Sequence, residues 1–598
     1  MDPSESFRTL SDLIRVHAEA RPDAPAVEDP AARLSYRELD ATADRVAASL
    51  QRDGVRSGDA VAICATGSAR YVAVFIGVLR AGAVVAPLSP SVTPAAFAAM
   101  VADAMGDRRS GADDGATGDD DCLLFVDAAA AGQVRPEGAV RAAGPGGRPL
   151  RIVAIDADGD ACADGGTLAD VDGIVAPPAC ADAIPWSAWL MPPGVRPVPV
   201  PVQPSDGFNL IYSSGTTGTP KGIVQPHSMR WAQINRGVYG YGPDAVTLLA
   251  TPLYSNTTLV VLLPSLAHGG RVVLMPKFDA AGYLALAERH RATHTMLVPV
   301  QYQRLLAVPG FDRFDLSSFR LKFSTSAPFS AALKAEVLRR WPGGLVEYYG
   351  MTEGGGTCIL VAHEHPDKLH TVGQPGPGSD IRLIDEDGRE LPANVLPAKA
   401  GEVVGEVVGH SPSMMTGYHR QPEKTREAEW FDAAGKRFIR TGDVGRFDAD
   451  GFLILLDRRK DLIISGGFNL YPSDLEAVLC GHPAVADAAV VGVPSAEWGE
   501  APVGFVVRRS DPVEALADAP DEARLRDWAN ARLGRMQRLA SIEFVDELPR
   551  SAIGKVLKRS LRDDWVARRG ALAEARDTRE IRWRPDPAAI SAGGDQIR

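Results

Sequence analysis

The sequence predicts an α/β protein with a large N-terminal domain, residues 1–459, and a small α+β C-terminal domain, residues 460–570. The chain of 598 residues is several times longer than a usual domain, so we expect more than one domain. Within 34–106 and again within 208–456, short β-branched runs alternate with helical periodicity, which is typical of a largely parallel sheet covered by helices. After Lys460 the alternation starts anew, which indicates the second domain.

The elements are expected in the following order. A helix over 34–54 precedes a strand at 59–64, and the apolar stretch 71–88 is a buried helix that runs into a strand. Residues 107–204 are rich in Gly, Ala, Asp and Pro, so they predict loops with two strands, at 122–127 and 151–156. Further strands are expected at 208–212, 271–276, 293–299 and 343–350. Asp450-Gly451 predicts a hairpin turn, and 571–598 is expected to be a disordered tail.

Composition and charge exclude several classes of function. Lys plus Arg number 64 against 76 Asp plus Glu, a net charge of -12, so no positive field would attract nucleic acid. Six cysteines are scattered without metal-ligand spacing, as expected for reduced thiols in a cytoplasmic protein. The first residues lack the pattern of a signal peptide, and no apolar stretch is long enough for membrane insertion.

The sharpest motif is the run YSSGTTGTPKG over residues 212–222. It follows an apolar strand-like run and offers unhindered backbone N–H groups, hydroxyls and one cation, a combination that suits a triphosphate. It is not the GTPase phosphate loop, because Pro220 and Gly222 stand where that pattern needs other residues. The candidate phosphate-binding residues are Ser213, Ser214, Gly215, Thr216, Thr217, Gly218 and Lys221.

This run resembles the phosphate loop of the adenylate-forming superfamily, which includes acyl-CoA ligases, luciferases and peptide-synthetase adenylation domains. Four further segments are similar to family motifs and follow in the family's order: YGMTE at 349–353, TGD at 441–443, DRRK at 457–460 and PRSAIGK at 549–555. The resemblance extends over residues 10–565. It implies that the large domain includes a smaller barrel-like part and that the C-terminal domain is mobile.

The resemblance also implies roles for these residues. Glu353 would hold Mg²⁺, Thr352 would bond the α-phosphate, and Lys555 would bridge carboxylate and phosphate, which fits a reaction that brings two anions together. Asp443 and Arg458 would bind the ribose. The rest of the ATP site would be Ser326, Ala327, Pro328, Tyr348, Tyr349, Gly350 and Met351, with Tyr349 against the adenine. Lys460 would be the hinge between the domains, and the CoA tunnel would be lined by Ser465, Gly466 and Gly467.

The acyl pocket implied by the resemblance is apolar with few charges, which favours a fatty, dicarboxylic or arylalkanoic acid. Its candidate residues are Tyr254, Ser255, Thr258, Val300 and Gly354. The segment TPLYSNTTL holds no aspartate to pair an amino group, so an α-amino acid is not expected. Many relatives carry a histidine or aromatic residue where Ser255 follows Tyr254, and Tyr348 would shorten or reshape an aryl pocket.

The expected activity is therefore that of an ATP-dependent carboxylate–CoA ligase that uses ATP, Mg²⁺ and coenzyme A. Two alternatives stay open: an acyl-AMP ligase that loads a carrier protein, and a non-catalytic nucleotide sensor. Pro549-x4-Gly554-Lys555 also resembles the pattern recognised by protein acyltransferases, which implies that acetylation of Lys555 would switch the enzyme off. The sequence leaves a monomer and a homodimer equally open.

Overall fold

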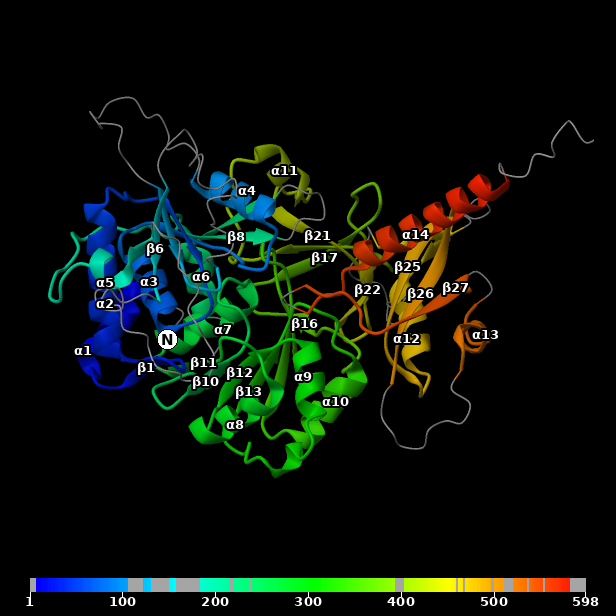
Figure 1. Ribbon diagram of the computed structural model, residues 1–598, viewed down its shortest axis with the longest axis horizontal. Helices are drawn as coiled ribbons and strands as arrows, with labels where there is room; N and C mark the ends of the chain where they lie inside the picture. The colour runs from blue at the N-terminus through cyan, green and yellow to red at the C-terminus, as the bar shows by residue number, and fades with distance from the viewer. Residues whose placement is uncertain are drawn as a thin grey trace, which may run out of the picture. The chain divides into compact units, whose positions relative to one another are not determined.

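The computed structural model describes most of the chain and divides it into two compact units. The described residues are 7–105, 122–130, 150–156, 183–213, 220–235, 239–392, 403–458, 461–465, 468–495, 499–509, 520–534, 537–551 and 554–580. Figure 1 colours the chain from blue at the N-terminus to red at the C-terminus. Unit 1 comprises Met1–Leu455 and Ala552–Lys555, and unit 2 comprises Leu456–Ser551 and Val556–Arg598.

The largest sheet of unit 1 has nine strands, and its six central strands are parallel. The antiparallel edge strands are β2 on one side and β15 and β16 on the other. The strand order is β16 (Gln374–Pro375), β15 (Cys358–Val361), β14 (Gly344–Tyr349), β13 (Leu321–Ser324), β12 (His294–Leu297), β10 (Val246–Leu249), β11 (Arg271–Leu274), β1 (Pro25–Glu28) and β2 (Arg33–Ser35).

A second sheet of eight strands is parallel from β8 to β7 and antiparallel at its other edge. Its order is β19 (Gly417–Tyr418), β9 (Lys221–Pro226), β8 (Gly207–Ser213), β4 (Val84–Pro87), β3 (Ala60–Cys64), β5 (Cys122–Val126), β6 (Leu150–Ala154) and β7 (Ile184–Pro185). The two strands expected within the Gly-rich region 107–204 are confirmed as β5 and β6.

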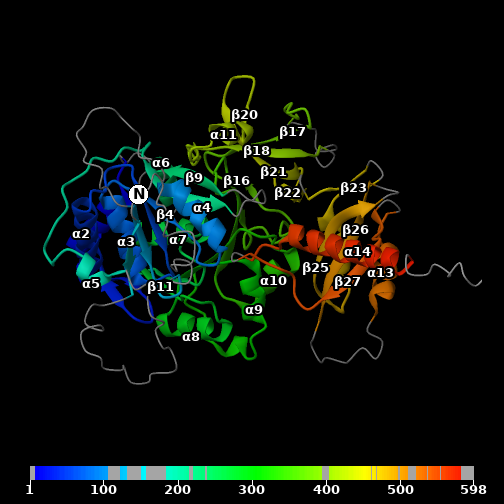
Figure 2. The ribbon, with the colours of Figure 1, turned by 45° about the horizontal axis from the view of Figure 1, so that its top comes forward.

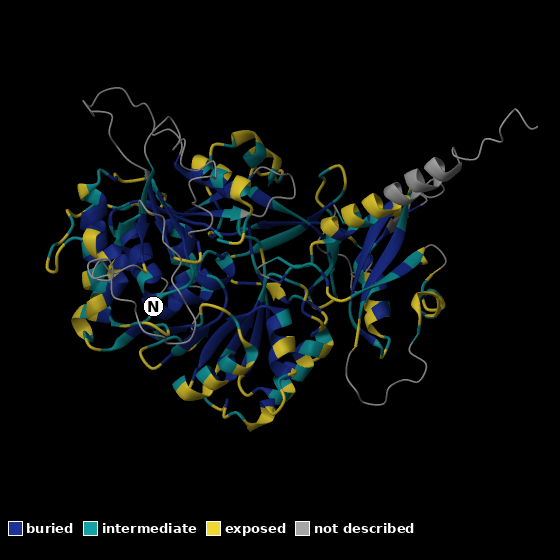
Figure 3. Cartoon of the chain, viewed as in Figure 1, coloured by how far each residue is buried: buried dark blue, intermediate teal, exposed yellow. Residues whose placement is uncertain are grey.

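Helices separate and cover these two sheets. The helices of unit 1 are α1 (Leu10–Ala20), α2 (Tyr36–Arg52), α3 (Ala69–Arg80), α4 (Pro94–Met105), α5 (Trp186–Trp189), α6 (His227–Ile234), α7 (Asn256–Ala267), α8 (Ala280–His290), α9 (Pro299–Leu306), α10 (Ala331–Arg340), α11 (Pro422–Glu427) and a 3-10 turn at Phe311–Arg313. One core joins α1, α2, α3 and α7 to both sheets, and two further cores place α8–α10 on one outer face and α4 on the other. Figure 3 shows that the strands are largely buried, while the helices expose their outer faces.

Local sequence explains where the first helices begin. The side chains of Thr9 and Ser35 accept hydrogen bonds from backbone N–H groups of the first turns of α1 and α2, and Asp12 and Glu38 reach back to the two caps. Such reciprocal capping boxes satisfy backbone donors that the helix itself leaves unpaired. The buried helix and strand expected at 71–88 are confirmed as α3 and β4.

A small sheet of five antiparallel strands completes unit 1 and contributes β22 to the boundary with unit 2. Its members are β17 (Asp380–Ile384), β18 (Gly405–His410), β20 (Glu429–Phe431), β21 (Arg437–Phe447) and β22 (Leu453–Arg458). Figure 2 shows these strands gathered together with α11 beside them. The expected hairpin turn at Asp450-Gly451 is confirmed between β21 and β22, where Gly451 adopts φ of 79°.

Unit 2 is an α+β domain, in which helices cover both faces of one sheet. Its strands are β23 (Ile463–Ser465), β24 (Phe468–Leu470), β25 (Val485–Ser495), β26 (Gly499–Arg508) and β27 (Ser541–Val545), and its helices are α12 (Pro472–Cys480), α13 (Glu522–Asn530) and α14 (Lys558–Glu580). One core includes α12 and α13, and a second packs Leu561 of α14 against β25 and β26, as α14 lies along β25 in Figure 1.

Two boundaries differ from the sequence prediction. Unit 2 begins at Leu456 rather than at 460, and residues 552–555 group with unit 1 instead of the C-terminal domain. Residues 571–580, expected as part of a disordered tail over 571–598, continue α14, which runs through Gly570 to Glu580. Residues 581–598 lie outside those described.

Candidate active site

The candidate nucleotide residues follow the carboxyl ends of two adjacent parallel strands, β13 and β14. Ser326, Ala327 and Pro328 come directly after β13, and Gly350 to Glu353 come directly after β14. Ligands of open α/β sheets bind outside this edge, where side chains from several loops meet. Ser326 holds φ of 80°, uncommon for a residue with a side chain, and its hydroxyl lies 2.5 Å from that of Thr257 on α7.

A hydrogen bond joins the YGMTE segment to the TGD segment. The Tyr349 hydroxyl donates to Oδ2 of Asp443 over 2.8 Å, and the backbone N–H of Asp443 donates to the hydroxyl of Thr441 at 3.0 Å. Burial, reinforced by the Asp443 carboxylate, raises the pKa of Tyr349 well above its usual value, so the phenol stays a donor. Asp443 is 8% exposed and keeps acceptor capacity beyond the bond to Tyr349.

Glu353 belongs to a second cluster, which sequence reasoning missed in part. The hydroxyl of Tyr418 on β19 donates to Oε1 of Glu353 at 2.9 Å, and Nζ of Lys221 lies 5.0 Å from the centroid of the same ring. Burial and then Glu353 raise the pKa of Tyr418. Tyr418 thus connects the expected metal-binding carboxylate to the expected phosphate-binding cation, and no motif in the sequence pointed to it.

The backbone after β14 is held from two sides. Nε2 of Gln225 on β9 donates to the carbonyl of Thr352 at 2.6 Å, and the N–H of Met415 donates to the carbonyl of Glu353 at 2.8 Å. Gly354 adopts φ of 78°, and a Cβ there would collide with the carbonyl oxygen of Ser413. Glycine is therefore required at 354 for the close approach of these two segments.

Aromatic rings gather beside the same edge. Tyr348 stacks on Phe323 with centroids 5.7 Å apart and planes 6° apart, and Tyr239 meets both rings edge-on. Such aromatic pairs stabilise the folded state by more than the burial of their apolar surface alone. Tyr348 is therefore fixed by packing from β13 and from the loop before β10.

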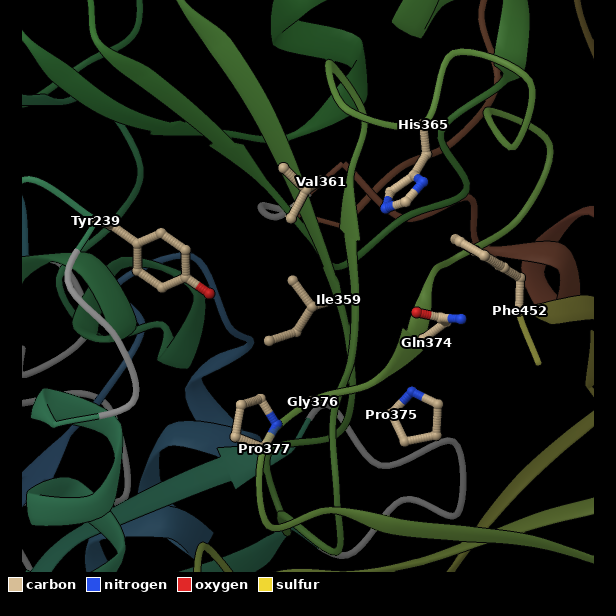
Figure 4. Close-up of a pocket in the computed structure, with 9 residues that line it drawn as sticks. All are labelled: Tyr239, Ile359, Val361, His365, Gln374, Pro375, Gly376, Pro377 and Phe452. Atoms are coloured by element: carbon tan, nitrogen blue, oxygen red, sulfur yellow. The ribbon is translucent and has the colours of Figure 1, made fainter. Parts of the chain in front are cut away.

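A cavity of about 220 Å³ lies between Tyr239 and the antiparallel edge of the nine-stranded sheet. Figure 4 shows Tyr239 facing Ile359 and Val361 of β15, with Phe452 and His365 opposite. The remaining lining is Gln374, Pro375, Gly376 and Pro377. None of the five acyl-pocket candidates lines this cavity.

The five acyl-pocket candidates lie on separate elements. Tyr254 and Ser255 precede α7, where the Ser255 side chain accepts from the N–H of Thr257. The hydroxyl of Thr258, which is fully buried, donates to the carbonyl of Pro252 and lies 2.8 Å from the hydroxyl of Thr251, so its hydrogen is not available to a ligand. Val300 is half-buried on α9. Thr257, which stands between Ser255 and Thr258 in the chain, contacts the nucleotide candidate Ser326 through its hydroxyl.

Several predicted site residues fall outside the described part of the chain. These are Ser214, Gly215, Thr216, Thr217 and Gly218 of the phosphate loop, Lys460 of the expected hinge, and Gly466 and Gly467 of the expected tunnel. Their flanks are described: Ser213 pairs with Lys221 across β8 and β9, and Ser465 pairs with Phe468 across β23 and β24. Arg458 ends β22 in unit 2, and Lys555 groups with unit 1.

The described residues contain no group of three or more His, Cys, Asp or Glu side chains able to hold a metal ion. No helix among them combines the length and apolar character needed to cross a bilayer. Cys64, Cys358 and Cys480 are free thiols. Glu353 fits Mg²⁺ as a single carboxylate beside a phosphate-binding cation, since Mg²⁺ is usually held by one or two carboxylates together with substrate phosphates.

The chain resembles known proteins along most of its length. The chain matches the AMP-binding enzyme family over residues 14–419 and the AMP-binding enzyme C-terminal domain over residues 474–555. It is 33% identical to 4-coumarate–CoA ligase-like 9 of Oryza sativa subsp. japonica, over 94% of this chain and 93% of that protein. It is 30% identical to the fatty acid–[acyl-carrier-protein] ligase ScoC of Streptomyces coeruleorubidus, over 93% and 96%.

A solved structure resembles the whole fold. The ATP-bound crystal structure of MatB from Rhodopseudomonas palustris matches with a TM-score of 0.72 and 28% identity, covering 93% of this chain and 99% of that one. The match confirms the α/β fold with a large N-terminal and a smaller C-terminal domain. The chain therefore belongs to the AMP-binding enzyme family of the adenylate-forming superfamily, and it is an enzyme of the acyl-CoA synthetase type.

Proposed function

We propose that this enzyme uses ATP to convert a hydrophobic carboxylic acid, whether fatty, dicarboxylic or arylalkanoic, into its acyl-adenylate and then into an acyl-CoA thioester. AMP and pyrophosphate are released. The proposal rests on two sets of contacts around the segment 349–353 at the end of β14. Tyr349 binds Asp443. Tyr418 contacts both Glu353 and Lys221. The carboxylate proposed to accept the ribose, a second carboxylate and a cation therefore lie around one loop.

In the first half-reaction, the carboxylate oxygen of the acid attacks the α-phosphorus of ATP and the bond to pyrophosphate breaks. Asp443 would accept the ribose hydroxyls, and Thr352 would hydrogen-bond the α-phosphate. Lys221 and Lys555 would offset the negative charge that grows on phosphate oxygens. Mg²⁺ held by Glu353 would neutralise charge on the triphosphate. The total charge is the same before and after this step, so the step needs no further proton donor or acceptor.

In the second half-reaction, the thiol sulfur attacks the acyl carbon and AMP leaves. Ser465, Gly466 and Gly467 are proposed to line the path of the pantetheine arm, because glycines allow backbone to approach a narrow channel closely. Lys460 is proposed as the hinge that lets unit 2 serve both steps.

The acceptor distinguishes the two candidate activities. The resemblance to a rice CoA ligase-like protein supports coenzyme A, and the resemblance to a Streptomyces fatty acid–carrier ligase keeps the carrier protein as the second candidate. The intact site residues Asp443, Glu353 and Lys555 argue against a non-catalytic sensor.

The test has two stages. ATP–pyrophosphate exchange is measured across fatty, dicarboxylic and arylalkanoic acids, and exchange with none of them would overturn the proposed activity. With the best acid, the thioester yield is then compared between coenzyme A and a phosphopantetheinylated carrier. A yield from the carrier alone would replace the CoA ligase by the acyl-AMP ligase. Gly467→Leu should keep exchange and lose the CoA thioester, with Gly534→Leu, which replaces an exposed glycine of unit 2 whose φ is not positive, as the control.

Three finer statements accompany the proposal. Acetylation of Lys555 would remove the cation that adenylation needs, so treatment with acetyl-CoA and a protein acyltransferase should modify Lys555 and stop exchange. Full activity with an unmodified Lys555 would contradict this.

A cytoplasmic location is proposed from the scattered cysteines, which suit reduced thiols. Sedimentation would decide between the monomer and the homodimer.

A further inference from the structure

An arginine is buried beneath the segment that carries Thr352 and Glu353. Arg230 on α6 is 1% exposed, and its guanidinium lies over the ring of Phe208 at 5.7 Å. Its partners are all neutral amide oxygens, those of Asn209, Gln233 and Gln225. Among the described residues, no carboxylate forms a salt bridge with it. Burying a charge without an opposite charge lowers the stability of the folded state. An apolar side chain at this position would avoid that loss of stability.

The arrangement fixes the direction of every amide in the cluster. A guanidinium only donates hydrogen bonds, so Arg230 must face the oxygens of Asn209 and Gln225. The amide nitrogen of Asn209 then donates to Oε1 of Gln225 at 3.0 Å. With its oxygen held by two donors, Gln225 must point its NH2 group the other way.

That NH2 group meets the backbone of the site. Nε2 of Gln225 donates to the carbonyl of Thr352 at 2.6 Å, and it lies 3.5 Å from Oδ1 of Asn256. A carbonyl only accepts, so the chain of hydrogen bonds runs in one direction from Arg230 to Thr352. The next carbonyl, that of Glu353, is held by Met415. The carbonyls of two successive peptide planes, 352–353 and 353–354, are therefore both held by hydrogen bonds, and Gln225 holds the first of them.

We propose that Arg230 and Gln225 are positioning residues that set the orientation of the Thr352–Glu353 peptide for adenylation. The inference rests on the proposed function. Neither side chain need touch the substrate: Arg230 fixes the Gln225 amide, and that amide fixes the loop. Since displacement of a reacting group by about 1 Å costs up to ~10²-fold in rate, loss of this relay lowers kcat of adenylation more than it raises KM for ATP.

The decisive variant is Gln225→Glu. A carboxylate at 225 forms a buried ion pair with Arg230, so the melting temperature is retained or raised. The same change removes the N–H donor and sets an oxygen against the Thr352 carbonyl. The expected result is a kcat for ATP–pyrophosphate exchange lower by about 10²-fold with a smaller change in KM. Wild-type kcat in this variant would overturn the proposal.

Two further measurements separate the relay from general destabilisation. Gln233→Leu removes an Arg230 partner that does not contact the 349–353 segment, so its kcat should stay near wild type. An equal loss in Gln233→Leu would assign the effect to stability and overturn the relay. In the double variant Arg230→Met/Gln225→Met, kcat should match that of Gln225→Met alone, because Arg230 affects the Thr352 carbonyl only through Gln225. Additive losses would give Arg230 a separate role.

One readout does not depend on activity. Hydrogen–deuterium exchange of the peptide that contains 350–355 should rise in Gln225→Glu and in Arg230→Met, and should not rise in Gln233→Leu. Unchanged exchange in the first two variants would overturn the relay even if the unaltered chain activates no acid. Failure of wild-type pyrophosphate exchange would instead overturn the proposed function, so the two failures are distinguishable.

Discussion

The hydroxyl of Tyr349 donates a 2.8 Å hydrogen bond to Oδ2 of Asp443, and it joins the end of β14 to β21 of the small antiparallel sheet. These residues are far apart in the sequence, and each belongs to a different motif. The bond orients the carboxylate that we propose as the ribose acceptor.

Asp443→Asn should raise KM for ATP by about 10²-fold, because it removes the charge from two hydrogen bonds to the ribose, each worth about 1.5–3 kcal/mol. Tyr349→Phe leaves the carboxylate in place and should raise KM by only about 10-fold. Initial rates of pyrophosphate exchange at varied ATP concentrations measure both. An unchanged KM in Asp443→Asn would remove Asp443 from the nucleotide site.

Lys555→Ala should lower adenylation by about 10²-fold or more, since it removes a cation from the transition state of the first half-reaction. Thioester formation from supplied acyl-AMP should persist, as this step develops no charge that Lys555 offsets. Arg559→Ala is the matched control, because the Arg559 side chain is 66% exposed and forms an ion pair with Asp563 one turn along the helix. Equal losses in both half-reactions would contradict the assigned role.

Tyr348→Ala should broaden the range of acids. Tyr348 is fixed by stacking on Phe323, so its removal opens space beside the 349–353 segment without replacing a charged group. We expect kcat/KM for bulky arylalkanoic acids to rise relative to short fatty acids, by roughly 10-fold from added apolar contact. Identical acid preferences in the two proteins would place the acyl pocket elsewhere.

His227 should make the large unit less stable in acid. Burial lowers the pKa of His227 to about 4, although Asp206 and Asp12 favour its charged form. Below the usual pKa of 6.5, the unfolded chain binds a proton that the folded chain refuses, so stability falls between about pH 6.5 and 4. The loss attributable to this group is about 3 kcal/mol. In His227→Phe, urea melts over this range should show a flatter pH dependence; an unchanged slope would refute it.

Lys558→Met should destabilise unit 2 by about 1–2 kcal/mol, between the costs of breaking an exposed and a buried ion pair, because the side chains of Lys558 and Glu476 are 19% and 21% exposed. Nζ of Lys558 lies 2.8 Å from Oε1 of Glu476, and burial already raises the pKa values of Glu476 and Asp457. The double variant Lys558→Met/Glu476→Gln should recover much of the loss, because it removes the uncompensated charge. Chemical denaturation of both variants measures this, and no recovery would show that the pair is not the cause.

The order of strands and helices, the two domains and the motifs could be predicted from the sequence alone. Alternation of apolar runs predicted α3, β4, β5 and β6, since local periodicity reports which face of an element is buried. The tail was the exception, because α14 continues through Gly570 to Glu580, where the sequence predicted disorder from residue 571. The resemblance of five ordered motifs likewise indicated adenylate chemistry without any coordinates.

Tertiary structure alone decided which side chains meet. Tyr418 reaches Glu353, and Gln225 reaches Thr352, across elements that are distant in the sequence. Neither residue belongs to a motif that marks it, because such contacts depend on how two sheets and their loops approach one another and not on local pattern. The sequence determined which reaction the chain can carry out, while packing between the sheets determined the residues that hold its reacting groups in place.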